Sequence, residues 1–565
     1  MVTYADKPWL KHYHKGVPEK LDIPVISLPE MLDRTVAKYP ESTAIYFMGR
    51  KILYKELKDH VDRFSTALAD LGIKKGDVVA IHLPNFPQFI IAYYGALKAG
   101  AAVTCISALL TAPEVKFQLN DAQAKAIVTM DGQPLQIVNG VKNETQLKHV
   151  IVTSLVDYLP GKPRRPAEKE GTHQMANLIA DNQPNPPKVN INPKEDIATL
   201  QYTGGTTGTP KGAMLTHHNL VANATQTINW FIWDLREGKE TCMVNLPLFH
   251  IYGMTCCMNS SINMGYCMAL NPDARDFPSL LSLIKSTKPS FFPGVPTLYM
   301  RLLQTKGVEK YYEDLKSIRM CNSGAAPMPP EVMKQFEQVT GGSILEGYGL
   351  TECCPVTHVN PDKETRKIGS IGLPIPNTDC RIVDIETGTK LMPVGEVGEL
   401  AIKGPQVMKG YWNKPGETKN QLKSKLLGEA GPWVLTGDIA KMDEQGYFYI
   451  VDRKKDMIDV SGFKVYPREV DDKLFEHPQV AMAAAVGIPD PKNPGSEVVK
   501  AFVVLKPGVP ENEETKKGIM DFAKRSMSPY KVPKEIEFRK ELPTTLIGKV
   551  LKRPLREEEK KKMSK

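Results

Sequence analysis

The sequence lacks any long uninterrupted run of hydrophobic residues. No stretch of its 565 residues reaches the roughly 18 apolar residues that a membrane-spanning helix needs. The N-terminal residues also lack the apolar segment of a secretory signal. We therefore expect a cytoplasmic protein without membrane-spanning helices, and leave open a peripheral contact at the inner face of the membrane.

Regularly spaced cysteines are also missing. The nine cysteines are an odd number, include two vicinal pairs, and show no C-x-x-C spacing. This pattern argues against a disulfide framework and against a zinc site, and it suits a reducing compartment. We expect these thiols to be small buried hydrophobic residues.

The chain is basic but has no nucleic-acid signature. Its formal net charge is +9, with much of the excess near the C-terminus. Such an excess suits nucleic acid, an anionic membrane or a polyphosphate ligand. Because no stretch interleaves aromatic residues with arginines, we expect no nucleic-acid partner. Glutamates dilute the charge of residues 556–565, which read as a solvated tail.

Length and hydrophobic patterning predict two domains of α/β type. The chain is too long for one ordinary domain. In the first half, residues 77–83 read as a buried strand and residues 86–99 as a helix, so parallel sheets covered by helices are expected. Residues 159–196, rich in proline and charge, read as a surface excursion or a link between subdomains.

The character of the chain changes at about residue 375. Short strand candidates separated by glycine and proline turns predict a β-rich subdomain up to residue 451. The pattern then returns to mixed helices and strands. We predict a large N-terminal domain at residues 1–451, a hinge at 452–455, and a small, mobile α+β domain at 456–565.

Residues 202–212 carry the clearest chemical signal. They combine glycines, threonine hydroxyls and one lysine, which together suit a loop around phosphate groups. The expected ligands are Thr203, Gly204, Gly205, Thr206, Thr207, Gly208 and Lys211. A Walker P-loop is excluded, because Pro210 precedes the lysine and Gly212 replaces the hydroxyl residue that would bind magnesium.

This loop resembles, residue for residue, the phosphate loop of the adenylate-forming superfamily of acyl-CoA synthetases, luciferases and peptide-synthetase adenylation domains. The other family motifs follow in order over about 350 residues. They are residues 247–253 (PLFHIYG), 323–327 (SGAAP), 346–352 (EGYGLTE), 436–438 (TGD), 452–456 (DRKKD), 461–467 (SGFKVYP) and 548–549 (GK).

The resemblance implies binding sites for ATP and Mg²⁺. It makes Glu352 the magnesium ligand, a hard oxygen donor that shares the ion with phosphate. Thr351 would donate to the α-phosphate, and Tyr348 would stack on adenine. Asp438 would accept from both ribose hydroxyls, with help from Arg453. The remaining nucleotide contacts implied are Gly324, Ala325, Ala326, Glu346, Gly347 and Gly349.

The resemblance also implies a two-step reaction. Lys549 would bridge the acid's carboxylate and the α-phosphate during adenylation, although Leu546 and Ile547 depart from the usual polar residues beside it. His250 would line the acid pocket as a wall rather than as a proton carrier. Rotation of the C-terminal domain at Lys455 would then present a coenzyme A channel.

For coenzyme A, the implied channel residues are Ser461 and Gly462. Arg275 and Lys531 are candidates for the coenzyme A phosphates, and a solvated-charge reading is about equally good for both.

The closest likeness within the superfamily is to long-chain fatty-acid–CoA ligases. It rests on residues 345–353, 403–408, 451–462 and 530–534. Because the pocket motifs carry no obvious charge, an apolar acid is expected. The alternatives are a medium-chain or aryl-acid CoA ligase, an acyl-adenylate ligase that serves a carrier protein, and a non-catalytic nucleotide-binding regulator. A homodimer and transient contact with a membrane surface are left open.

Overall fold

The largest sheet of the computed structural model lies in the N-terminal half. The structure describes residues 2–161, 165–203, 210–490, 493, 496–544 and 550–563. The sheet has eight strands in the order β18-β9-β8-β4-β3-β5-β6-β7. Their bounds are β18 (Gly410–Tyr411), β9 (Lys211–Thr216), β8 (Ile197–Thr203), β4 (Ala102–Cys105), β3 (Val78–His82), β5 (Ala126–Met130), β6 (His149–Thr153) and β7 (His173–Gln174).

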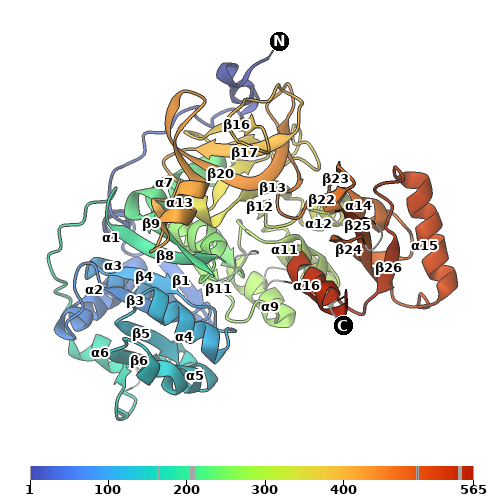
Figure 1. Cartoon of the computed structure of the whole chain (residues 1–565). Helices are drawn as coiled ribbons and strands as arrows, with labels where there is room; N and C mark the ends of the chain where they lie inside the picture. Colours follow the sequence, from blue (N-terminus) through green and yellow to red (C-terminus); the bar gives the residue numbers. More distant parts are fainter. Residues whose placement is uncertain are drawn as a thin grey trace.

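Helices cover both faces of this sheet (Figure 1). Every residue of β3 is buried, and alternate residues face different cores, as in a parallel sheet. Val79 and Ile81 pack into the main core, which takes in α2 (Tyr54–Asp70) and α3 (Pro87–Lys98). Val78 and Ala80 pack into a second core, with α4 (Ala112–Asp121) and α5 (Gln133–Val141).

Two further four-stranded sheets extend this part of the chain. One runs β10-β11-β1-β2 and the other β12-β13-β14-β15. Phe291 forms parallel bridges to Cys242 of β10 and to Met320 of β12, which joins the two sheets. The strands are β10 (Thr241–Val244), β11 (Cys267–Leu270), β1 (Thr43–Phe47), β2 (Arg50–Leu53), β12 (Met320–Ser323), β13 (Ser343–Gly349), β14 (Val356–Val359) and β15 (Leu373–Pro374).

The β-rich region predicted after residue 375 is a five-stranded antiparallel sheet. Its order is β16-β17-β20-β19, and β21 pairs with β20. This sheet lies at the top of Figure 1. The strands are β16 (Asp379–Val383), β17 (Gly398–Lys403), β19 (Leu422–Leu426), β20 (Glu429–Met442) and β21 (Phe448–Arg453).

The C-terminal elements form a smaller unit with its own apolar core (Figure 1, right). A three-stranded sheet, β24-β25-β26, packs against helices, and β22 and β23 form a separate hairpin. The elements are β22 (Ile458–Val460), β23 (Phe463–Val465), α14 (Pro467–Phe475), β24 (Val480–Pro489), β25 (Glu497–Leu505), α15 (Glu513–Ser526), β26 (Glu535–Phe538) and α16 (Lys552–Met563).

The remaining helices join or cover these sheets. Ser27 accepts a hydrogen bond from the Glu30 N–H (3.2 Å) and so caps α1. The helices are α1 (Leu28–Lys38), α6 (Met175–Asp181), α7 (His217–Trp230), α8 (Ser260–Met264), α9 (Phe277–Thr287), α10 (Pro296–Leu303), α11 (Tyr312–Leu315), α12 (Pro330–Thr340) and α13 (Pro415–Gln421), with a π-helical turn at Gly253–Asn259 and a 3₁₀ turn at Thr351–Cys353.

The fold class predicted from the sequence is confirmed: a mixed α/β protein with a larger N-terminal and a smaller C-terminal part. Residues 159–196 differ from a simple surface excursion. They add β7 to the edge of the largest sheet, and α6, whose Met175 and Ile179 are buried in the main core, packs on α2. Prolines and charged residues surround these few apolar residues in the sequence, so no helical pattern could be recognised there.

All nine cysteines are free thiols. Within the described part of the chain, no helix has both the length and the apolar character to cross a bilayer.

Candidate active site

The predicted phosphate loop joins two strands of the largest sheet. Gly204, Gly205, Thr206, Thr207 and Gly208 lie outside the described residues. The flanks are described: β8 ends at Thr203, β9 begins at Lys211, and these two residues pair across the antiparallel hairpin. Both flanking ligands predicted from the sequence therefore stand side by side at the base of the loop.

The side chains around this base hold it in place. Lys211 Nζ lies 2.5 Å from Glu417 Oε2 and 5.3 Å from the centre of the Tyr411 ring. On the neighbouring strand, the Tyr202 hydroxyl donates to Asp121 Oδ2 (2.6 Å). The ammonium of Lys211 thus lies over Tyr411 of β18, a residue that contacts the next predicted ligand.

That ligand, Glu352, is held by Tyr411. The Tyr411 hydroxyl donates to Glu352 Oε1 (2.6 Å), and the Met408 N–H donates to the Glu352 carbonyl (2.8 Å). Tyr411 pairs with Ala213 of β9, the strand that begins at the base of the phosphate loop, and so its bond holds Glu352 beside the strand next to β9. Tyr411 was not predicted as a site residue, although it follows the family-like residues 403–408 in the sequence.

The described residues contain no cluster of three or more His, Cys, Asp or Glu side chains that could hold a metal by themselves. The protein offers the carboxylate of Glu352. This donor set fits Mg²⁺ bound through one carboxylate and substrate phosphates, which is how that ion is usually held.

The motif at residues 346–352 is built tightly around two glycines. A Cβ at Gly349 would lie 2.3 Å from the Pro355 carbonyl oxygen, and one at Gly347 would lie 2.9 Å from Asn322 Nδ2. Glu346 accepts from the Met328 N–H (2.9 Å), and burial raises the pKa of its carboxyl group. β13 can therefore bring Tyr348 to the site only if residues 347 and 349 lack side chains.

Tyr348, Asp438 and Arg453 form a triad that is joined by one hydrogen bond and one ion pair. The Tyr348 hydroxyl donates to Asp438 Oδ2 (2.5 Å), and Arg453 Nε lies 3.1 Å from Asp438 Oδ1. Asp438 and Arg453 are register partners on β20 and β21. The nearby Asp438 charge raises the pKa of Arg453, while burial, followed by Asp438, raises the pKa of Tyr348. Each Asp438 oxygen keeps accepting capacity for a further donor.

The loop at Gly324, Ala325 and Ala326 follows β12 and meets the histidine motif. A Cβ at Gly324 would lie 3.4 Å from the Tyr252 ring, whose hydroxyl donates to the Asn322 carbonyl (2.7 Å). Ala325 has a φ of +70°, in the left-handed region.

His250 stands two residues before Tyr252. Its Nδ1 accepts from the Tyr252 N–H (3.2 Å), and burial lowers its pKa to about 4. A neutral imidazole suits a wall residue.

The predicted site residues of the C-terminal part that the structure describes lie in two places: Lys455 follows β21, and Ser461 and Gly462 lie in the β22–β23 hairpin. Burial, followed by the charge of Arg453, lowers the pKa of Lys455 to about 8. Ser461 and Gly462 form the turn of the β22–β23 hairpin, both with positive φ, and the Gly462 N–H donates to Asp459 Oδ1 (2.7 Å). Lys549 and its neighbour Gly548 lie outside the described residues.

The two further candidates for coenzyme A phosphates already have acidic partners. Arg275 pairs with Asp273 (3.1 Å) and Lys531 with Glu469 (2.6 Å).

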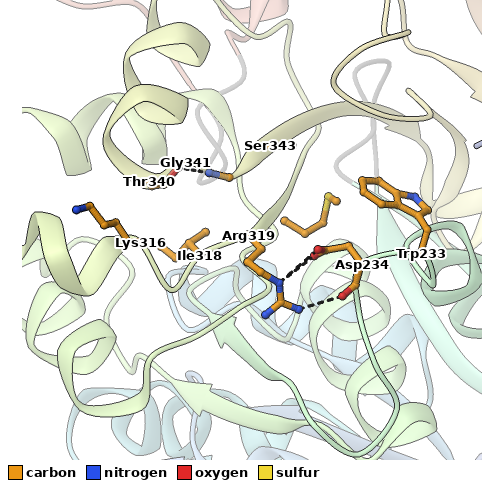
Figure 2. Close-up of a pocket in the computed structure, with 10 residues that line it drawn as sticks. Trp233, Asp234, Lys316, Ile318, Arg319, Thr340, Gly341 and Ser343 are labelled. Carbon is orange, nitrogen blue, oxygen red and sulfur yellow. Dashed lines mark hydrogen bonds and ion pairs between the residues drawn. The ribbon is translucent and has the colours of Figure 1, made fainter.

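A separate cavity of about 240 Å³ lies beside the starts of β12 and β13, whereas the predicted nucleotide residues follow the end of β12 and lie in the second half of β13. Figure 2 shows Arg319 directed toward Asp234 in this cavity (3.3 Å). The cavity is therefore not part of the predicted nucleotide site.

Known proteins resemble this chain over nearly its full length. The family model of AMP-binding enzymes matches residues 32–412, and that of the AMP-binding enzyme C-terminal domain matches residues 469–549. The chain belongs to the AMP-binding enzyme family. The resemblance predicted from the sequence motifs is confirmed.

The relatives include a long-chain-fatty-acid–CoA ligase from Bacillus subtilis (strain 168), 43% identical over 98% of each chain. Among solved structures, an anthranilate CoA ligase in complex with anthranoyl-AMP aligns with a TM-score of 0.83 at 27% identity, covering 96% of this chain and 99% of that one. ATP-bound MatB from Rhodopseudomonas palustris aligns with a TM-score of 0.82 at 28% identity, covering 94% and 99%.

Proposed function

We propose that the chain is an ATP-dependent fatty-acid–CoA ligase. In the first step the acid's carboxylate oxygen attacks the α-phosphorus of ATP, which forms an acyl-adenylate and expels pyrophosphate. In the second step the thiol of coenzyme A attacks the acyl carbon, loses its proton and expels AMP. The 43% identity to a fatty-acid–CoA ligase across the whole chain supports this assignment.

The observation that carries the proposal is the grouping of two hydrogen-bonded units. Tyr411 and Glu352 form one unit beside the phosphate loop, and Tyr348 joins Asp438 in the other. Glu352 and Tyr348 come from one short motif, so the two units are four residues apart. A nucleotide with its ribose at Asp438 and its metal-bound phosphates at Glu352 would therefore lie along residues 348–352.

Mg²⁺, held by Glu352, would neutralise phosphate charge when bound. Thr203, Lys211 and the residues between them would cradle the phosphates, and Thr351 would donate to the α-phosphate. Lys549 would offset the charge that builds up when two anions meet. It would enter from a mobile domain at residues 456–565 that turns at the hinge 452–455 against residues 1–451.

An apolar acid suits the region after His250. Met254, Cys256, Cys257 and Met258 lie on the π-helical turn and are fully buried. π-helical turns often occur at functional sites. These four side chains are apolar and uncharged, which favours a fatty tail over an acid with a second polar group.

A panel of acids of increasing length, with and without coenzyme A, tests the proposal. AMP and pyrophosphate release should depend on a fatty acid, and acyl-CoA should form only with coenzyme A present. Aryl acids as the preferred substrates, or acyl transfer only to a carrier protein, would replace the proposal by one of its alternatives. No turnover with any acid would favour a nucleotide-binding regulator.

Lys549→Ala tests the assigned catalytic lysine. Acid-dependent ATP–pyrophosphate exchange should be largely lost, whereas thioester formation from supplied acyl-adenylate should be retained. An equal loss in both steps would show that the role is wrong.

We also propose that the cytoplasmic enzyme touches a membrane surface transiently to take up its substrate, and that it forms a homodimer. Vesicle sedimentation and light scattering test these two points separately.

A further inference from the structure

The segment between the two parts of the molecule is fixed on its N-terminal side at Lys454. The Lys454 N–H donates to the Gly437 carbonyl of β20 (2.9 Å), and its ammonium pairs with Glu399 Oε2 of β17 (2.9 Å). Both the backbone and the side chain of Lys454 are therefore attached to the β-rich sheet. The chain becomes free to turn only after the Lys454 nitrogen.

On its C-terminal side the same segment is held by Arg556, about a hundred residues later. Arg556 Nη1 donates to the Lys455 carbonyl (3.0 Å), and Nη2 pairs with Asp456 Oδ1 (2.7 Å). The Asp456 side chain is 13% exposed and that of Arg556 is 22% exposed, so solvent competes little for the pair. A planar guanidinium can bridge two acceptors in this way, whereas an ammonium cannot reproduce its fork.

The Lys455 carbonyl belongs to the peptide plane that joins residues 455 and 456. Rotation about the two backbone torsions of Lys455 moves this plane relative to the β-rich sheet. Because Arg556 fixes the plane to α16, the plane must move together with the C-terminal elements. Two turn hydrogen bonds also span this stretch, from the Asp456 and Met457 N–H groups to the Arg453 carbonyl (3.0 and 3.2 Å), and a rotation would break them. The backbone torsions of Lys454 and Lys455 then form the pivot.

α16 is itself tied firmly to the C-terminal sheet. Lys552 pairs with Asp471 of α14 (2.5 Å), and Lys500 of β25, 3% exposed, pairs with Glu559 (2.8 Å). Just before α16, Val550 bridges Thr544, which closes the base of the segment 545–549. The pivot and the base of the segment that contains Lys549 are therefore both attached to the same helix.

We propose that Arg556 is a positioning residue that clamps the Lys455–Asp456 peptide to α16. The clamp confines the domain rotation to Lys454 and Lys455 and makes Thr544 and Val550, on either side of residues 545–549, turn with the clamped peptide as one body. This inference rests on the proposed function, since it assigns Arg556 a part in placing Lys549 during adenylation. The positions of Ser461 and Gly462 depend less on the Arg556 clamp, because the Ser461 N–H donates to the Ser496 hydroxyl and so holds their hairpin separately.

The test compares Arg556→Gln with Arg553→Gln in the full-length protein. Arg553 lies on the same helix, and its partner within the described part of the chain is the local Glu557 (2.5 Å), so its variant is the matched control. Loss of a charged hydrogen bond at the clamp should lower ATP–pyrophosphate exchange by about tenfold to a hundredfold. Thioester formation from supplied acyl-adenylate should change by less than about threefold, as should both steps in the control.

Two more variants separate the clamp from a general loss of charge or stability. Arg556→Lys should restore little of the exchange activity, because it keeps the charge but not the fork. Asp456→Asn should slow exchange as well, and the double variant with Arg556→Gln should be no slower than the slower single variant. Full activity of Arg556→Lys, or additive effects in the double variant, would overturn the proposal.

A readout without substrate comes from limited digestion by trypsin, which cleaves after lysine and arginine. Arg556→Gln should increase cleavage at residues 453–455, whereas Arg553→Gln should not. Equal cleavage of both variants, together with equal partial reactions, would overturn the clamp. If the wild-type protein formed no acyl-adenylate from any acid, the proposed function would fail instead, and the trypsin result would still decide whether the clamp exists.

Discussion

At the residue scale, Tyr348 has two separable features, an aromatic ring and a hydroxyl group. The ring packs edge-on against His358 (5.9 Å between centres), while the hydroxyl bonds to Asp438. The sequence motif predicts the ring's contact with adenine but gives no sign of the bond to Asp438, because the two residues lie 90 positions apart. The hydroxyl orients the carboxylate that we assign to the ribose.

Tyr348→Phe should therefore raise the KM for ATP while leaving the fold intact. A hydrogen bond to a charged acceptor contributes about 1.5–3 kcal/mol, so the expected increase is about tenfold or more. Tyr449→Phe is the matched control, since Tyr449 makes the same kind of bond to Asp443 (3.1 Å). Steady-state kinetics at saturating acid measures both variants. An unchanged KM in Tyr348→Phe would show that the bond from Tyr348 is not needed to orient Asp438 for ATP.

His358 gives a prediction for pH. Burial lowers its pKa from 6.5 to about 3. Between these values the unfolded chain binds a proton that the folded chain does not, so stability is lost as the pH falls through this window. The contribution has a slope of at most about 1.4 kcal/mol per pH unit.

His358→Gln, which cannot titrate, should lack this contribution. The free energies of unfolding of wild type and variant should converge as the pH falls from about 6.5 to about 4. Urea unfolding followed by tryptophan fluorescence at several pH values measures the difference. Parallel curves for the two proteins would contradict the depressed pKa.

At the element scale, β13 can reach the site because Gly349 lets the strand pass close to the backbone of Pro355. Gly349→Ala would place a methyl group against a backbone carbonyl, which cannot move aside as a side chain can. The expected loss of stability is about 1–3 kcal/mol. ATP affinity should fall as well, since Glu352 and Tyr348 flank this glycine. Chemical unfolding and equilibrium binding of ATP measure the two effects.

Gly416→Ala provides the control for this substitution. Gly416 lies in α13, where an added Cβ meets nothing within 4 Å. Alanine favours the helix by up to about 1 kcal/mol, so this variant should be unchanged or slightly more stable. If Gly349→Ala were as stable as Gly416→Ala, the close approach of β13 to Pro355 would not limit the site.

Helices and strands whose hydrophobic residues recur with a clear period could be predicted from the sequence. Residues 77–83 became β3 (Val78–His82), and residues 86–99 became α3 (Pro87–Lys98). Helix α6 could not be predicted, because a few apolar residues within a proline-rich stretch give no repeating pattern. The sequence also could not indicate Tyr411, whose contact with Glu352 depends on the antiparallel pairing of β18 with β9.

At the scale of the whole molecule, the C-terminal unit is held in its present orientation by Arg468. Its N–H donates to Asp452 Oδ2 (2.6 Å) and its guanidinium to the Ile450 carbonyl (2.9 Å). Asp452 and Ile450 precede the pivot, whereas Arg468 follows it. A rotation about Lys454 and Lys455 would break both bonds. Their modest net worth, about 1–3 kcal/mol each, permits two orientations of similar free energy.

Lys455→Pro should restrict this exchange between orientations. Proline fixes its own φ near −65° and also disfavours helical torsions at Lys454. We expect thioester formation from supplied acyl-adenylate to fall by up to about a hundredfold, because the coenzyme A face could no longer be aligned. Adenylation should fall less. Stopped-flow measurement of AMP release from the acyl-adenylate, beside pyrophosphate exchange, gives the ratio of the two steps.

Lys455→Ala separates the backbone restriction from the loss of the ammonium group. Alanine keeps both torsions free, so this variant should retain the wild-type ratio of the two steps even if its overall rate changes. The ratio must shift in the proline variant alone, because only there is the pivot restrained. If alanine shifted the ratio as much as proline did, the charge of Lys455 rather than its backbone would govern the second step, and the hinge would have to be sought elsewhere in residues 452–455.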